Sequence, residues 1–400
     1  MLSAVILLSA CAQPEGPVGS EVGDDLGGVA RVDSFQVDAS ACFIAPHLGT
    51  GGSSHLYVGS GYGLNVQSLI RFSPPRIPAG WTLDSTRQQR LRLTAQGGIG
   101  EGSFPVIEAR RMHRFWSEAN PPHWGDVSEG ENLRLEVAVN DTGKGYISLF
   151  LEAEWFKQWM TRVDSIRADA TASDSLEIDT SLTIWLFSDE AQDRLARILS
   201  RNSIADSLRP RLTIYAFHSD TVGMPTLDSL SSTAAADAFL VHNDSTDTEG
   251  RLVVGSGAVY QFNLRFDLSR LQRRREDYHI VVNRALLILQ KIPEAYPQFP
   301  QTLSLWPFKL TDDRWLTDPD SSSEAGFTVI TTSVNQDSMN AKITLTNLAA
   351  EWIADSTKNH GLAVHSGGEG LDLNRIAFYG ASSSPQQRPR LRIYWTEIPR

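Results

Sequence analysis

Short segments in which apolar and polar residues alternate recur along most of the chain. Clear examples are residues 133–139, LRLEVAV, residues 182–186, LTIWL, and residues 391–395, LRIYW. A period of two places one face of a strand in a core and the other face in water, which is typical of antiparallel sheets. Turn-forming clusters such as residues 140–145, NDTGKG, separate these segments. The pattern predicts an all-β protein.

Two stretches depart from this period and predict helices. Trp155 and Trp159 stand one helical turn apart, and Leu348 and Trp352 repeat that spacing. Apolar residues four positions apart lie on the same face of a helix, so we expect a short helix packed on the end of a β-layer at each place.

The chain also repeats itself. Residues 209–215, RPRLTIY, and residues 388–394, RPRLRIY, agree at six of seven positions. Other matching pieces follow the same order in both halves: LYVGSG at 56 and LVVGSG at 252, LIRF at 69 and LRF at 264, and AEW at 153 and 350. A stretch that is compatible with a helix, 191–200, corresponds to 373–378, LNRIAF, which has the character of a strand, so we expect strands at both places.

This tandem duplication predicts two modules. Modules of this size, when built from short alternating strands, are usually β-sandwiches or jelly rolls. We therefore expect two tandem antiparallel β-sandwich or jelly-roll modules, each with a short helix, over residues 31–217 and 236–400. Residues 218–235, rich in Ser, Thr, Ala and Asp, are expected to form a linker. The RPRL strand is expected to close each sandwich, since its proline precedes the strand and costs no ladder hydrogen bond there.

The N-terminal residues suggest where the protein is located in the cell. Residues 1–11, MLSAVILLSAC, resemble the lipobox of bacterial lipoprotein signal peptides, and the resemblance implies that Cys11 is lipidated. No Lys or Arg precedes the apolar run, which is short for a secretory signal and far too short to span a bilayer; a start upstream of Met1 stays open. Residues 12–30 are rich in Gly, Pro and acidic residues and predict a flexible tether. We expect a membrane-anchored lipoprotein of the cell envelope, at the outer membrane or cell surface.

Composition narrows the possible binding partners and the possible disulfide bonds. With 47 acidic residues against 36 Lys and Arg, the net charge is −11. Phosphate binding needs a basic face, so a nucleic-acid role is not expected. Cys11 and Cys42 are the two cysteines of the sequence. If Cys11 carries lipid, no disulfide framework exists, and stability must come from burial.

Three stretches resemble a known family. They are residues 77–85, IPAGWTLDS, followed by LRL at 91–93; WSE at 116–118, followed by Trp124; and NHGLAV at 359–364, followed by Arg375, Phe378 and the RPRL strand. They resemble the DNRLRE family of bacterial surface modules, which is akin to alginate-binding carbohydrate-binding modules. The second module lacks the Pro-Ala-Gly turn and the second tryptophan, and the string that names the family is absent. The resemblance implies a β-sandwich of secreted or surface proteins, often found beside polysaccharide-degrading enzymes.

Motifs for catalysis are not found. The sequence has no H-E-x-x-H and no G-x-S-x-G, and the glycines at 49–52 and 97–100 do not lead into a helix start with lysine. Glu118 and Asp126 could imitate the carboxylate pair of a glycosidase, but loop carboxylates are common and this interpretation is disfavoured. We expect no enzyme, although an unrecognised activity stays open as a third possibility.

One acidic stretch, TDDRWLTDPD, has the oxygen ligands that Ca²⁺ prefers. Its carboxylates belong to Asp312, Asp313, Asp318 and Asp320. Their spacing matches no EF-hand loop, and a solvated acidic loop is the favoured interpretation. No cofactor is expected, and calcium is the alternative that stays open.

Three of the ten tryptophans in the sequence are the best candidates for contact with a ligand. Sugars stack on exposed aromatic rings, and Trp81, Trp124 and Trp306 stand among Pro, Gly and polar residues. Packing inside the protein is the alternative for each ring. We expect a non-catalytic surface protein that binds polysaccharide or another extracellular polymer. The alternative is a structural or adhesive subunit, or a spacer, of a surface assembly that binds other proteins.

Overall fold

A computed structural model describes most of the chain after residue 27. The described residues are 28–44, 50–61, 63–84, 86–100, 104–112, 115–118, 121–122, 124, 130–168, 180–190, 193–219, 224–243, 250–257, 260–293, 302–318, 321, 323–326, 332–334, 337–368, 370 and 372–400. The lipobox and nearly all of the expected tether lie outside these ranges. Across the ranges above, no helix combines the length and the apolar character needed to cross a membrane.

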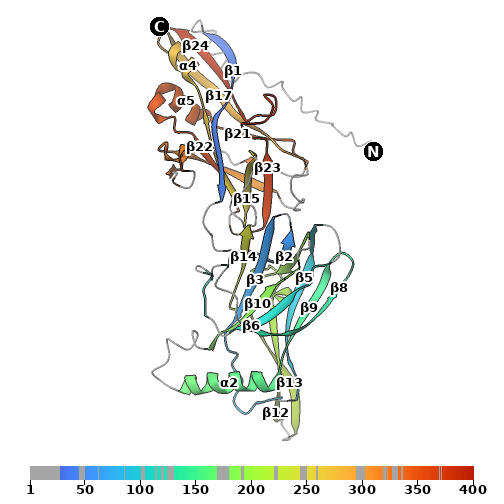
Figure 1. Cartoon of the computed structure of the whole chain (residues 1–400). Coiled ribbons are helices and arrows are strands. Elements are labelled where there is room, and N and C mark those ends of the chain that lie inside the picture. Colours follow the sequence, from blue (N-terminus) through green and yellow to red (C-terminus); the bar gives the residue numbers. More distant parts are fainter. Residues whose placement is uncertain are drawn as a thin grey trace, which may run out of the picture.

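The all-β prediction is confirmed: curled antiparallel sheets form two sandwich-like half-barrels. We call the strands β2–β14 with α2 the first β-unit (residues 50–243), and β1 with β15–β24 the second β-unit (residues 28–44 and 250–400). Figure 1 shows the two units end to end, with α2 at one end and the beginning of β1 and the C-terminus at the other.

The first β-unit is a single curled sheet. Its strands are β2 (His55–Gly61), β3 (Leu64–Phe72), β4 (Thr82–Leu83), β5 (Gln89–Gly100), β6 (Glu108–Met112), β7 (Glu131–Asn132), β8 (Arg134–Val139), β9 (Lys144–Leu151), β10 (Leu182–Phe187), β11 (Arg194–Leu199), β12 (Arg211–Ser219), β13 (Pro225–Thr233) and β14 (Ala236–Asn243). The helix α2 spans Ala153–Ala168, and the short helix η2 spans Asp206–Leu208.

The second β-unit has a larger sheet in the order β19-β18-β22-β16-β1-β24-β17-β21, with β20 beside β18, and the pair β15-β23. Its strands are β1 (Val29–Ile44), β15 (Leu252–Ser256), β16 (Tyr260–Phe266), β17 (Tyr278–Gln290), β18 (Leu303–Leu310), β19 (Glu324–Ala325), β20 (Thr332–Val334), β21 (Asn340–Thr344), β22 (Leu362–Ser366), β23 (Asn374–Phe378) and β24 (Arg390–Pro399). Its helices are α4 (Ser269–Arg274), η3 (Arg314–Leu316), α5 (Thr346–Ala354) and η5 (Ser356–Lys358).

Both predicted helices are present and are held by an apolar face. Trp159 of α2 is buried in the core of the first β-unit, and Trp352 of α5 is buried in the core of the second. Trp155 packs against the first core while remaining partly exposed. The strands β11 and β23 confirm the choice of strand over helix at 191–200 and 373–378.

The repeated RPRL segment forms β12 and β24. Leu212 and Leu391, which follow the second arginine of each motif, are fully enclosed in the two separate cores. The first arginine of each motif covers the preceding loop: Arg209 Nε donates to Ser203 O at 2.9 Å, and Arg388 Nε donates to Ser383 O at 2.7 Å. The repeat is therefore architectural.

The first strand departs from the predicted module range. The first part of β1, from Val29 to Gln36, pairs with β24, and the part from Val37 to Ile44 pairs with β16. Phe35 and Val37 lie in the core of the second β-unit. Strand β1 therefore completes the C-terminal unit, although it precedes the N-terminal unit in the sequence.

The expected linker at 218–235 needs correction over its second part, because β13 lies there and pairs with β12 along nine residues, Pro225–Thr233. Strand β14 then pairs with β3. Most side chains of β13 face solvent, with Leu230 packed against the core, so a Ser- and Thr-rich composition fits an edge strand as well as a linker.

Candidate functional sites

Trp81 lies in a tight turn at the α2 end of the first β-unit. The Trp81 N–H donates to Pro78 O at 3.1 Å, and Gly80 has a φ of +82°, which favours glycine. The indole ring stacks on the imidazole of His218 from β12, with centroids 4.5 Å apart and planes 24° apart. One ring face is thereby held by the sheet, which fixes the position of the side chain.

This turn forms one wall of a groove of about 450 Å³. Residues 77–83 line one side, and α2 lines the other with residues at the helical spacing i, i+3, i+4 and i+7: Lys157, Met160, Thr161 and Asp164. Residues at these positions share one helix face. The groove therefore joins an aromatic ring, a buried methionine and three exposed polar side chains.

The polar groups of the groove supply both donors and acceptors. The Lys157 ammonium donates, the Asp164 carboxylate accepts, and the Thr161 hydroxyl does both. Asp164 also lies 3.7 Å from Arg167 of the same helix, while Thr161 Oγ1 donates to Lys157 O at 2.9 Å. An aromatic surface with a few hydrogen-bonding groups fits a polyhydroxylated ligand, whose C–H faces stack and whose hydroxyls pair.

The other two tryptophan candidates lie elsewhere. Trp124 is half-buried, packs against the cluster around Trp116 and Trp185, and stacks on His242 with centroids 5.3 Å apart. Trp306 on β18 is 45% exposed and covers Gly367, where an added Cβ would lie 2.3 Å from the indole nitrogen. The structure does not gather Trp81, Trp124 and Trp306 into one site.

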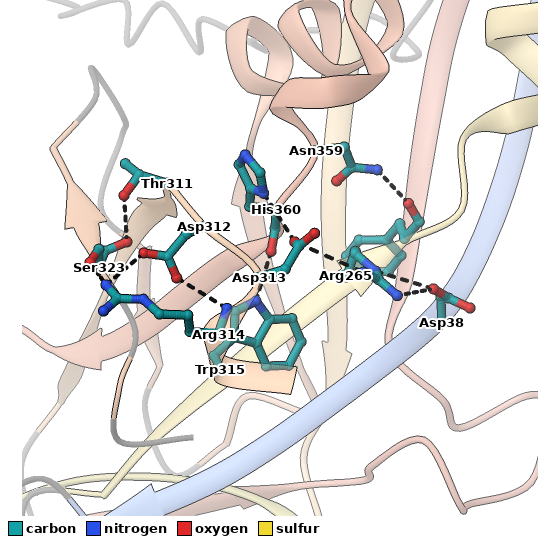
Figure 2. A network of polar contacts seen from close by, with 11 residues as sticks. Asp38, Arg265, Thr311, Asp312, Asp313, Arg314, Trp315, Ser323, Asn359 and His360 are labelled. Carbon is teal, nitrogen blue, oxygen red and sulfur yellow. Dashed lines mark hydrogen bonds and ion pairs between the residues drawn. The ribbon is translucent and has the colours of Figure 1, made fainter. Parts of the chain in front are cut away.

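Two of the acidic candidates for calcium, Asp312 and Asp313, pair with basic side chains (Figure 2). Asp312 Oδ2 lies 2.8 Å from Arg314 Nη2, and this bond lowers the pKa of Asp312 to about 2. Asp313 Oδ1 lies 3.0 Å from His360 Nδ1 and 4.0 Å from Arg265 Nη1. Asp320 lies outside the described residues, while Asp318 contributes a backbone carbonyl to a turn. Within the part of the chain that the structure describes, no three His, Cys, Asp or Glu side chains gather as a metal site.

A basic and aromatic surface was missed by sequence reasoning. The outward faces of β8, β9, β5 and β12 carry Arg134, Phe150, Tyr146, Arg90, Arg92 and Arg211, with Arg92 directly opposite Arg211. We call these six residues the arginine face. The guanidinium of Arg92 lies 3.4 Å from the ring centroid of Tyr146, and Arg90 Nη2 donates to Ser148 Oγ at 2.7 Å.

Little negative charge balances this surface. Arg134 pairs with Glu136 at 2.6 Å, but among the residues that the structure describes Arg90, Arg92 and Arg211 form no ion pair. The alternating letters RLRL at 90–93 signal two arginines on one strand face. The cross-strand register, which adds Arg211 and Tyr146, is not visible from one strand alone.

A buried carboxylate was also missed. Asp237 of β14 is 1% exposed, its Oδ2 accepts from Arg201 N at 2.5 Å, and burial raises its pKa to about 7. Glu118 accepts from the Asp237 N–H at 3.1 Å and lies 3.2 Å from Arg201 Nε. Glu118 therefore stabilises the chain around β14, while Asp126 lies outside the described residues. The enclosed Asp237 is out of reach of a substrate.

Comparison with known proteins gives no relative: no family model and no curated protein matches this chain.

Proposed function

We propose that the protein is a non-catalytic, lipid-anchored cell-surface protein that binds polysaccharide or another extracellular polymer. The observation that carries the proposal is the groove between Trp81 and α2, which pairs a ring fixed on one face with exposed donors and acceptors. A ring already held in place loses little side-chain entropy when a ligand stacks on it. The resemblance to DNRLRE-type modules supports the same ligand class.

The arginine face favours a polymer that carries negative charge. Guanidinium groups bind carboxylates and sulfates through paired hydrogen bonds, and a ring beneath the guanidinium holds it flat. We expect the charged groups of a linear polyanion to pair with the arginine face, and its sugar rings to bind in the groove between Trp81 and α2. Arg92→Ala is therefore expected to weaken binding of charged polymers more than binding of neutral ones.

The binding test uses residues 28–400 and a panel of neutral and uronic-acid polysaccharides. Trp81→Ala is expected to weaken binding about five-fold or more, since aromatic stacking contributes about 1 kcal/mol. The melting temperature is expected to change little, because Trp81 belongs to a turn outside the two cores. Trp306→Ala, which removes an exposed ring of the second β-unit, is the matched control. Equal binding by wild type and Trp81→Ala would leave the groove without a role in ligand binding.

Anchoring is tested separately. If Cys11 carries lipid, Cys11→Ser moves the protein from the detergent phase into the aqueous phase. Unchanged partitioning would show that the likeness to a lipobox is accidental, without affecting the binding result.

The alternative role, as a structural subunit of a surface assembly, is favoured by a different observation. Strand β1 completes the second β-unit by pairing with β16 and β24, and a strand in this position could also come from another copy of the chain.

A further inference from the structure

The two β-units are completed in the same way. In the first unit, β13 pairs with β12 and β14 pairs with β3. In the second unit, the two parts of β1 pair with β24 and β16. The hydrogen bonds at the crossover match: Ala234 N donates to Pro210 O at 3.3 Å, and Val37 N donates to Pro389 O at 3.1 Å. Because Pro210 and Pro389 are the same position of the RPRL repeat, β13–β14 and β1 are equivalent elements.

Their places in the chain differ. The segment β13–β14 follows the last strand of the first unit, completes that unit, and then leads into the second unit. Strand β1 leads into the first unit in the same manner, yet within these 400 residues the unit that it completes is the C-terminal one. Like β13–β14, β1 therefore completes one unit and leads into the other. Within one chain, this requires the N-terminal strand to pair with strands of the C-terminal unit.

The groove between β16 and β24 recognises β1 through side chains as well as through the ladder. Phe35 and Val37 fill the core, and Trp395 Nε1 donates to Asp33 Oδ2 at 3.0 Å. Asp38 pairs with Arg265 at 3.1 Å (Figure 2). At the other end, Arg31 pairs with Glu397, which is 4% exposed. These contacts depend on the sequence of β1 and not on which copy of the chain supplies it.

We propose that this groove is a docking site for a second copy of the chain: β1 of one copy completes the second β-unit of the next, which links copies head to tail. Every contact made by the strand in such a link is already present within one chain, so the two arrangements differ mainly in effective concentration. Adding a strand to an open sheet position supplies a full ladder of backbone hydrogen bonds. Because donor and acceptor are different surfaces, the link extends from copy to copy and builds the surface assembly.

Cross-linking the full-length chain tests this. Ser34 and Arg392 are direct cross-strand partners, and both are at least partly exposed. In the double variant Ser34→Cys/Arg392→Cys, treated with a mild thiol oxidant, a strand supplied by another copy gives covalent dimers and higher multiples. Their share is expected to rise with protein concentration. The matched control is Ser34→Cys/Thr213→Cys, because Thr213 occupies in RPRLTIY the place of Arg392 in RPRLRIY and pairs with Ser231 instead. The wild-type chain, which retains Cys11 and Cys42, is the blank.

A covalent ladder in the double variant, absent from the control and the blank, supports head-to-tail linkage. Cross-linked monomer as the sole product at every concentration overturns it, because β1 then stays in its own chain. Failure to cross-link at all also overturns it, because the strand then does not pair with β24. The cross-linked products do not depend on whether the protein binds a glycan. Failure of this proposal and failure of the proposed binding function can therefore be told apart.

Discussion

Trp81, Trp124 and Trp306 have similar sequence surroundings, and their neighbours in the fold separate them. Trp81 lines a groove, Trp124 is packed against a cluster of buried apolar residues, and Trp306 is 45% exposed on a strand. Sequence reasoning could identify tryptophans flanked by Pro, Gly and polar residues. It could not say which ring faces of each are covered, because His218 and His242, which stack on two of them, are far away in the chain.

The stability of the strand β14 is expected to depend on pH through Asp237. In the folded protein the pKa of Asp237 is raised from 3.8 to about 7, chiefly by burial, so the folded state retains a proton that the unfolded chain releases. The contribution of Asp237 to the free energy of unfolding therefore falls as the pH rises from about 4 to about 7, and it is constant above that range.

The measurement is urea unfolding of wild type and Asp237→Asn at pH 4.5 and pH 8. Asparagine cannot ionise, so the stability of wild type relative to the variant is expected to be greater at pH 4.5 than at pH 8. An equal difference at the two pH values would show that Asp237 is already ionised at pH 4.5.

At the scale of elements, sequence reasoning located strands and helices better than it located their partners. The period of two and the paired tryptophans identified β8, β10, β24, α2 and α5. The partner of β1 was not predictable, because the two grooves that could hold this strand are built from the same RPRL and arginine-phenylalanine segments. Because both β-units contain these segments, a strand such as β1 could pair in either unit. The alternation of apolar and polar residues determines which face of the strand is buried, but not which unit the strand joins.

Phe35→Ala tests the placement of β1. Phe35 is 9% exposed in the core of the second β-unit, so its truncation is expected to cost about 3 kcal/mol and to destabilise that unit. Val32→Ala, on the same strand but 54% exposed, is the matched control and is expected to cost less than about 0.5 kcal/mol. Hydrogen exchange resolved by segment measures the effect. Faster exchange in β16, β17 and β24, with β3 and β12 unchanged, is expected; the reverse pattern would place β1 in the first unit.

At the scale of the whole molecule, the two ends of the chain lie together. Val29 pairs with Glu397, so the described chain begins beside its C-terminal strand, at the end of the molecule opposite α2 (Figure 1). The units meet through a cluster that includes Tyr57, Phe239 and Leu373, and the Tyr57 hydroxyl donates to Asp372. The second β-unit therefore contains both the first described strand and the C-terminal strand, and the groove beside Trp81 lies at the opposite end of the molecule, next to α2 (Figure 1).

The most direct test of the account is where a polysaccharide binds. Incorporating 5-fluorotryptophan gives one fluorine label at each of the ten tryptophans, and single substitutions assign their NMR signals. On titration with an oligosaccharide from the best-binding polymer, the Trp81 signal is expected to shift, while the signals of buried Trp315 and Trp352 stay fixed. A saturable shift of Trp81 agrees with binding in the groove. Binding that leaves the Trp81 signal unchanged would contradict the account.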